Sequence, residues 1–208
     1  MNTTEINILI VEDEPIIAAD IESALEKNEY SVSDIAYSKE DALLSLKNNT
    51  PDFAILDINL NGEIHGIEIA EIIKNNYKLP FIFLTSYSDK NTLDKAKHTE
   101  PSGYLVKPFS EPSLFTTIEV ALYNHAQKMK MQFPELNTAL INKKLTIPLS
   151  EREIDLLQLI YNGKTNQRIA DELYISLNTV KKHINHMYLK LESNSRSTTI
   201  ARIRQLLM

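Results

Sequence analysis

The sequence predicts an α/β protein: a five-stranded, doubly wound parallel sheet in the N-terminal part, followed by a second, smaller all-α domain. Short apolar runs alternate with amphipathic segments five times within about 120 residues, and runs that are apolar at consecutive positions are typical of strands covered on both faces. The net charge also changes, from −12 over residues 1–124 to +3 over residues 146–208. An acidic half joined to a basic half indicates two domains with different partners.

The elements of the N-terminal part follow from periodicity and from residues that begin or end helices. Pro15 and Pro112 suit the first turn of a helix, where a backbone N–H has no intrahelical partner. Ser38 is a capping residue, and the helix that it starts must stop before Pro51. The expected strands are residues 6–11, 31–36, 53–56, 81–84 and 104–106, and the expected helices begin near residues 15, 38, 66, 89 and 112.

The sequence predicts only helices in the C-terminal part. Residues 128–145 carry four lysines and a proline without sustained periodicity, which predicts a linker. Ser150 and Glu153 have the spacing of a capping box at the start of a helix. Helices over residues 165–173 and 177–191, joined by a short turn, form a helix-turn-helix candidate. The expected domains are therefore residues 1–127, a linker over 128–145, and residues 146–208.

Composition excludes several classes of protein. The chain has no cysteine, so disulfides, thiolate nucleophiles and cysteine-bound zinc are absent. No window approaches the roughly 18 uninterrupted apolar residues of a membrane span, and the polar first residues, 1–5, do not read as a signal peptide. We expect a cytoplasmic protein that does not associate with a membrane.

Polar side chains follow four of the predicted strands. Glu12 and Asp13 follow the first strand, Asp57 closes the third, and Thr85 and Lys107 follow the fourth and fifth. Because parallel strands end at one edge of the sheet, these groups should share one rim, where open α/β sheets place their sites. Three carboxylates would repel one another unless a cation lay among them, and oxygen ligands favour Mg²⁺. With that ion, an ionised Asp57 could serve as a nucleophile toward a phosphoryl group.

These motifs resemble the receiver domain of two-component response regulators, over about residues 5–125. The resemblance implies a flavodoxin-like sheet and makes Asp57 the phosphoacceptor of a sensor histidine kinase. The segments that carry it are Val11-Glu12-Asp13-Glu14-Pro15, Leu56-Asp57-Ile58-Asn59-Leu60, Leu84-Thr85-Ser86 and Gly103-Tyr104-Leu105-Val106-Lys107-Pro108-Phe109.

Further roles are implied by the same resemblance. Glu12, Asp13, Asp57 and the backbone carbonyl of Asn59 would hold Mg²⁺. The remaining implied roles are phosphoryl contact for Thr85 and Lys107, a side chain that turns with the phosphorylation state for Tyr104, and a cis peptide bond before Pro108.

The loop after Asp57 departs from the family pattern. Most receivers have a proline four residues and a glycine eight residues beyond the acceptor. Here those positions are Asn61 and His65, and Gly66 comes one place late. The sequence therefore predicts a loop that is one residue longer.

Three segments of the C-terminal part are Leu149-Ser150-Glu151-Arg152-Glu153, Gly163-Lys164-Thr165-Asn166-Gln167-Arg168-Ile169-Ala170 and Ser176-Leu177-Asn178-Thr179-Val180-Lys181-Lys182-His183-Ile184. Through these segments, residues 146–208 resemble the LuxR-type helix-turn-helix of the NarL/FixJ class. Helical spacing places Lys181, Lys182 and Asn185 outward on the second helix, where they could contact phosphates or base edges of double-stranded DNA. Because one such helix reads only a few base pairs, we expect an active homodimer on an inverted-repeat site.

Two other functions fit parts of the sequence. One is a dimeric DNA-binding regulator that works without phosphorylation. The other is an aspartyl-phosphate hydrolase of the haloacid dehalogenase kind, but that family needs a second Asp two residues after the nucleophile, where this chain has Asn59. We therefore expect a regulator rather than an enzyme.

We also expect Asn59 and Tyr87 to flank the line along which water attacks a phosphoryl group on Asp57.

Overall fold

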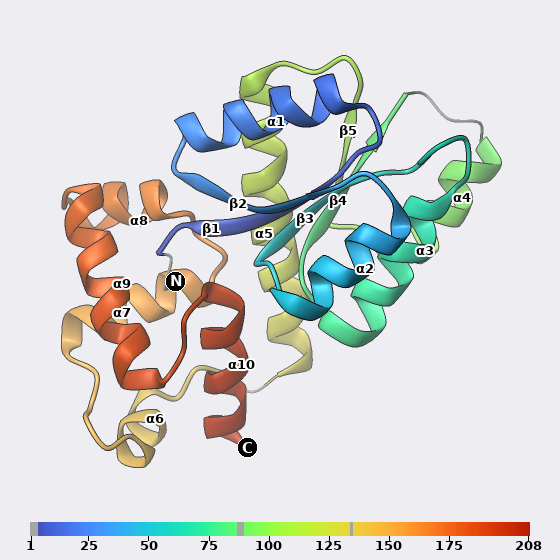
Figure 1. Cartoon of the computed structure of the whole chain (residues 1–208). Helices are drawn as coiled ribbons and strands as arrows, with labels where there is room; N and C mark the ends of the chain where they lie inside the picture. Colours follow the sequence, from blue (N-terminus) through green and yellow to red (C-terminus); the bar gives the residue numbers. More distant parts are fainter. Residues whose placement is uncertain (1–3, 87–89, 134) are drawn as a thin grey trace. The chain divides into compact units, whose positions relative to one another are not determined.

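The computed structural model describes residues 4–86, 90–133 and 135–208. The chain divides into two compact units, one of residues 7–122 and one of residues 1–6 together with 123–208. Helix α5 (Glu111–Gln132) begins in the first unit and ends in the second (Figure 1). Tyr87 lies outside the described residues, so the expectation for it stays a prediction.

The first unit is built on a five-stranded sheet. The strand order is β2-β1-β3-β4-β5, and the pairs β1–β3, β3–β4 and β4–β5 are parallel. This order confirms the predicted doubly wound fold, in which the point between β1 and β3 is where such sheets place their ligands. The strands are β1 (Ile6–Val11), β2 (Tyr30–Ala36), β3 (Phe53–Asp57), β4 (Phe81–Thr85) and β5 (Gly103–Val106).

Helices cover both faces of this sheet, so every residue of β3 and β4 is buried. On one face, buried residues of α2, α3 and α4 form a single apolar cluster with Phe81 and Phe83. On the other face, the space beside Gly103 is filled by Ile82 of β4 and Thr117 of α5. Besides α5, the helices of this unit are α1 (Pro15–Lys27), α2 (Lys39–Asn48), α3 (His65–Ile72), continued by a π-helical turn (Ile73–Tyr77), and α4 (Lys90–His98).

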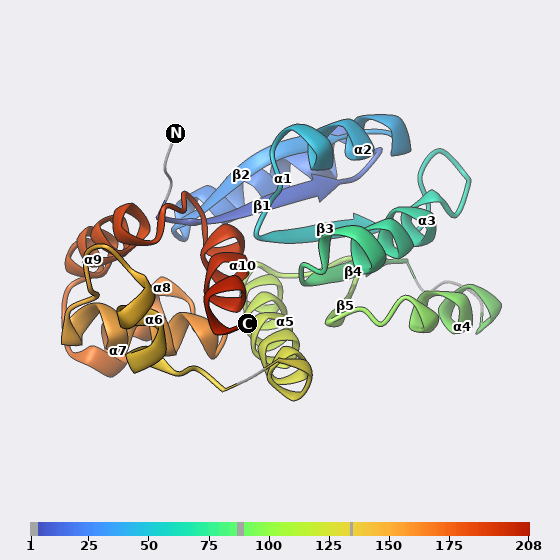
Figure 2. The same cartoon turned by 90° about the horizontal axis from the view of Figure 1, so that it is seen from below.

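The second unit holds a helical domain with its own apolar core. Figure 2 shows its helices gathered together. Ser150 caps α7 in the predicted capping box with Glu153, and Ser176 caps α9. The core includes Val180, Ile184 and Met187 of α9. The helices are α6 (Thr138–Lys144), α7 (Glu151–Tyr161), α8 (Asn166–Leu173), α9 (Leu177–Leu191) and α10 (Arg196–Leu207). Within the described ranges, none of the helices is both long and apolar enough to cross a membrane.

The sequence reading missed two helices. Helix α6 lies in the segment that we expected to be a linker: Asn137 caps it, and Ile141 is fully buried in the helical core. Helix α10 starts at the capping residue Ser195 and buries Ile203. Residues 128–132 also continue α5, so the segment 128–145 is largely helical, and the domain limits stay a prediction.

Candidate functional site

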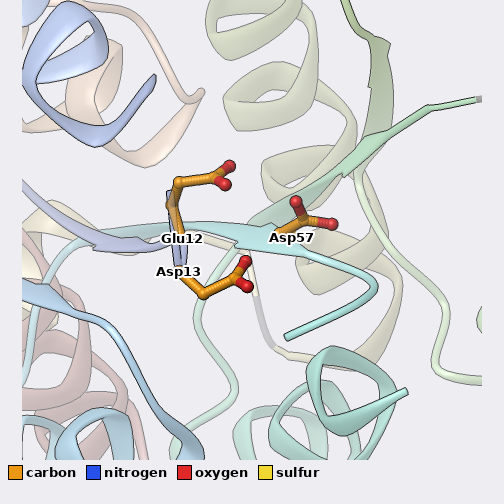
Figure 3. Close-up of side chains that lie close together, drawn as sticks. All are labelled: Glu12, Asp13 and Asp57. Atoms are coloured by element: carbon orange, nitrogen blue, oxygen red, sulfur yellow. The ribbon is translucent and has the colours of Figure 1, made fainter. Parts of the chain in front are cut away.

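The acidic side chains lie at the carboxyl ends of two neighbouring strands. β1 and β3 are in register from Ile8 and Phe53 to Val11 and Leu56, so the next residues along the two chains, Glu12 and Asp57, lie side by side. The carboxylates of Glu12, Asp13 and Asp57 point into the same space (Figure 3), and one oxygen from each lies within 4.8 Å of the other two. Glu12 and Asp57 are buried, so their mutual repulsion is weakly screened.

Lys107 brings a positive charge to this rim. Its Nζ lies 2.5 Å from Asp57 Oδ2 and 2.6 Å from Glu12 Oε2, and its side chain is 9% exposed. The backbone N–H of Lys107 donates to the Thr85 carbonyl at 2.8 Å, and this hydrogen bond joins the end of β5 to the end of β4. The peptide bond between Lys107 and Pro108 is cis. The rim thus holds an ammonium between two buried carboxylates.

The electrostatics of the rim leave a surplus of negative charge. Burial raises the pKa of Glu12, the nearby Lys107 ammonium opposes this, and the Asp57 carboxylate adds to it. Burial disfavours the Lys107 ammonium, but its contacts with Asp57 and Glu12 outweigh burial and raise the pKa of Lys107. The ammonium therefore stays charged and balances one of three carboxylates. Residual negative charge among oxygen donors is what a divalent cation needs.

The donor set fits Mg²⁺. Glu12 Oε2 lies at ion-pair distance from Lys107 but accepts no hydrogen bond of good geometry from the described residues. The carboxylate trio of Glu12, Asp13 and Asp57 offers only oxygen atoms as ligands, and hard cations prefer oxygen ligands. Among the described residues, Glu12, Asp13 and Asp57 are the one group of three or more His, Cys, Asp or Glu side chains placed to share a metal ion.

Two further predicted residues, Thr85 and Asn59, lie close to these carboxylates along the sheet or the chain, and Tyr104 lies farther away on β5. Thr85 ends β4, is 5% exposed, and its neighbour Leu84 pairs with Asp57. The backbone N–H of Asn59 donates to Asp57 Oδ1 at 3.0 Å. Tyr104, in β5, is 36% exposed, with its ring 5.9 Å from that of Phe83, and burial raises the pKa of Tyr104.

The loop after Asp57 contains a group that the sequence analysis did not identify. The backbone N–H of Asn61 donates to Asp13 Oδ2 at 2.9 Å, although the two residues are far apart in sequence. The Asn61-Gly62 dipeptide was the available signal, because Asn-Gly is typical of tight hairpin turns. The loop therefore supplies a donor to one of the three carboxylates.

The predicted DNA-reading residues lie on α9. Lys182 and Asn185 are exposed, on the face opposite the buried Val180 and Ile184. Lys181 is partly buried, and its Nζ lies 3.0 Å from Glu5 Oε1 within the same unit. Two more polar residues of this helix, Asn178 and His186, are also exposed, and helical spacing places them near Lys182.

Comparison with known proteins agrees with the geometry. Residues 8–119 match the response regulator receiver domain, and residues 147–203 match the luxR family of bacterial regulatory proteins. The chain is 30% identical over 216 residues to the response regulator ArlR of Staphylococcus haemolyticus, covering 95% of this chain and 96% of that protein. It is 29% identical over 201 residues to the transcriptional regulatory protein DesR of Bacillus subtilis, covering 96% and 97%.

A solved structure supports the same assignment for the first unit. The signal receiver domain of a modulated diguanylate cyclase from Desulfovibrio desulfuricans G20 covers 59% of this chain and 97% of its own, with 35% identity and a TM-score of 0.55. The receiver match spans more than half of the chain, and the C-terminal match spans its helical domain. The chain therefore belongs to the response regulators, and it combines a receiver domain with a C-terminal LuxR-type DNA-binding domain.

Proposed function

We propose that this response regulator controls transcription in a phosphorylation-dependent way, with Asp57 accepting a phosphoryl group from a sensor histidine kinase. One observation carries the proposal: Glu12, Asp13 and Asp57 converge at the switch point of the sheet with Lys107 beside them. A surface cluster of acids would not need a buried lysine aimed at two of its members. A nucleophilic carboxylate that must meet an anionic phosphoryl group does need that lysine.

Each group has a separate task in this proposal. An oxygen of Asp57 forms a bond to phosphorus while the bond from phosphorus to the donor breaks. Bound through Glu12, Asp13, Asp57 and the Asn59 carbonyl, Mg²⁺ would neutralise charge on the phosphoryl oxygens. Lys107 supplies a second positive charge and the Thr85 hydroxyl a donor, so the product has balanced charge on several sides.

Two residues on the strands beyond β3, Thr85 of β4 and Tyr104 of β5, would respond to the phosphoryl group. Thr85 is buried at the end of β4, so a new oxygen acceptor nearby would draw its hydroxyl. Tyr104 is half-buried against Phe83, and its ring could turn inward as Thr85 moves. The phosphoryl group thereby biases a conformation that the free protein already samples.

The output would be binding of a homodimer to an inverted repeat. The exposed α9 residues Lys182 and Asn185, with Lys181 beside them, are the groups that would enter a major groove. Two copies are needed because a single helix contacts too few base pairs for specificity. We retain residues 1–127 as the receiver, 128–145 as the connection and 146–208 as the DNA-binding domain in this proposal.

Labelling with radioactive acetyl phosphate tests the acceptor. The wild-type chain should take up about one phosphoryl group per chain in Mg²⁺, and Asp57→Asn should take up none. Asp52→Asn is the matched control, because Asp52 is a buried aspartate next to the opposite end of β3 and should label like the wild type. Stoichiometric labelling of Asp57→Asn would refute the assignment.

Selection of DNA from a random pool tests the output. With the phosphoryl donor and Mg²⁺, the wild-type chain should enrich an inverted repeat, and Asp57→Asn should not respond to the donor. Equal enrichment with and without the donor would instead favour a regulator that binds DNA without phosphorylation.

A further inference from the structure

The loop between β3 and α3 is a small hairpin. Leu60 and Glu63 form an antiparallel bridge. The Leu60 N–H donates to the Glu63 carbonyl at 2.8 Å, and the Glu63 N–H donates back at 3.0 Å. Between them, Asn61 and Gly62 both have left-handed φ, 53° and 84°. Two left-handed residues in a two-residue loop are the geometry of a type I′ turn.

The hairpin is anchored at its base and open at its tip. Leu60 is fully buried in the apolar cluster of the receiver sheet, and Ile64 packs against the same cluster. At the tip, no described atom lies within 4 Å of a Cβ built on Gly62. The buried base therefore fixes where the tip groups stand.

One tip group meets the metal-binding rim. The Asn61 N–H donates to Asp13 Oδ2 at 2.9 Å. This hydrogen bond is accepted by Oδ2 of the Asp13 carboxylate. One oxygen of that carboxylate also lies within 4.8 Å of a ligand oxygen of Glu12 and of Asp57. Asp13 is more exposed than its two partners, so repulsion from them would otherwise turn its side chain toward water.

We propose that the Asn61-Gly62 hairpin is a positioning element for the metal site, and that the backbone N–H of Asn61 holds the Asp13 carboxylate in the orientation that a divalent cation requires. The inference rests on the proposed function, because it takes Asp13 as a Mg²⁺ ligand. Hydrogen bonds to metal-binding carboxylates orient them in this way, and losing such a bond typically weakens metal binding by about 10–100-fold. The loop that is one residue longer thereby gains a role in the site as well as joining two elements.

The backbone, not the Asn61 side chain, carries this role. The Asn61 side-chain amide contacts the Tyr37 carbonyl at 3.4 Å, at the outer limit of a hydrogen bond. Asn61→Gly therefore keeps both the left-handed turn and the N–H. Asn61→Val should open the turn, because a β-branched residue strongly disfavours left-handed φ.

Lys78→Val is the matched control. Lys78 is also an exposed residue with left-handed φ, 55°, but it follows the π-helical turn Ile73–Tyr77. The same substitution there imposes the same kind of backbone strain in a part of the chain that contributes nothing to the carboxylate trio. It separates general destabilisation from an effect on the metal site.

The experiment is a Mg²⁺ titration of the full chain followed by amide chemical shifts. Asn61→Val should raise the Mg²⁺ dissociation constant roughly tenfold or more, while Asn61→Gly and Lys78→Val should stay within about twofold of the wild type. A wild-type affinity for Asn61→Val would overturn the inference. An equal loss in Asn61→Gly would also overturn it, because the side chain would then be responsible.

A second measurement needs no folded valine variant. In metal-free protein, the Asn61 amide should exchange with solvent roughly tenfold faster in Asp13→Ala than in the wild type, because a hydrogen bond to a charged group is removed. An unchanged exchange rate would overturn the inference even if Asn61→Val failed to fold. Absence of any Mg²⁺-dependent shift in the wild type would instead count against the proposed function.

Discussion

Gly66 lies against the backbone of Asp57: a Cβ on residue 66 would stand 1.8 Å from the Asp57 carbonyl oxygen. The Gly66 N–H also donates to the Ile58 carbonyl at 3.2 Å. The obstacle is backbone in a fully buried strand, so it cannot move aside as a flexible side chain could. The glycine that comes one place late in this loop therefore still lets α3 approach the acceptor strand.

Gly66→Ala should destabilise the receiver unit by about 3 kcal/mol or more. Urea denaturation followed through amide signals of residues 7–122 would measure this loss. Gly62→Ala is the control: among the described atoms none lies near its added Cβ, but its φ of 84° is unfavourable for alanine, so a loss of about 1 kcal/mol is expected. Equal losses at the two positions would show that close packing at Gly66 is unimportant.

Lys107→Ala should destabilise the metal-free receiver and be partly rescued by Mg²⁺. Removing the ammonium leaves Glu12 and Asp57 buried without their cation, which costs about 2 kcal/mol. Calorimetric melting with and without Mg²⁺ would check both effects. Lys97→Ala, which breaks an exposed ion pair with Asp94, should change stability by less than about 1 kcal/mol. Equal losses for the two variants would contradict the buried pairing.

The helical domain should lose stability in acid through Glu153. Burial alone would raise its pKa, but hydrogen bonds from Lys190 and Ser150 outweigh burial and lower the pKa of Glu153 below its ordinary value of 4.5. An acid whose pKa is lowered by folding stabilises the fold above its unfolded pKa, and this contribution disappears as the pH falls through the folded pKa. The stabilisation is therefore complete near neutral pH.

Glu153→Gln tests that dependence. It should cost about 1–2 kcal/mol at pH 7, and the difference from the wild type should shrink steadily below about pH 4.5, measured by urea denaturation at several pH values. Glu151→Gln is the control, since Glu151 lies exposed in the first turn of the same helix. A difference that stays constant down to pH 3 would contradict the role of the Glu153 charge.

The rim of the sheet could be predicted from the sequence, because each group follows directly after an apolar strand. Parallel strands carry such groups to one edge whatever the details of packing. The hydrogen bond between Asn61 and Asp13 could not be predicted in the same way, since it joins distant residues through the exact shape of a turn. Helix α6 was missed because it is seven residues long, too short to show a periodic pattern.

Asn185→Ala should relax DNA specificity without altering the salt dependence of binding. Asn185 is neutral and exposed on α9, so it would contribute through hydrogen bonds to a base edge rather than through charge. On the selected site, affinity should fall by about 1–3 kcal/mol, with weaker preference at one position in each half-site. Binding to matched and mismatched sites by fluorescence anisotropy measures this. Equal weakening on every sequence would assign Asn185 to a phosphate instead.

Lys181→Ala distinguishes base reading from phosphate binding. If Lys181 reads a base, affinity for the selected site should fall by about 1–3 kcal/mol and preference should relax at one position in each half-site. If it binds a phosphate, binding should weaken evenly, and the slope of log affinity against log salt should fall by about 0.9 for each phosphate that is no longer neutralised. Measuring matched and mismatched sites at two salt concentrations separates the two results.

Lys143→Ala removes the same charge from the exposed surface of α6 in the same unit, so it corrects for the change in net charge. If Lys181→Ala and Lys143→Ala behave alike on all DNA, Lys181 has no part in recognition.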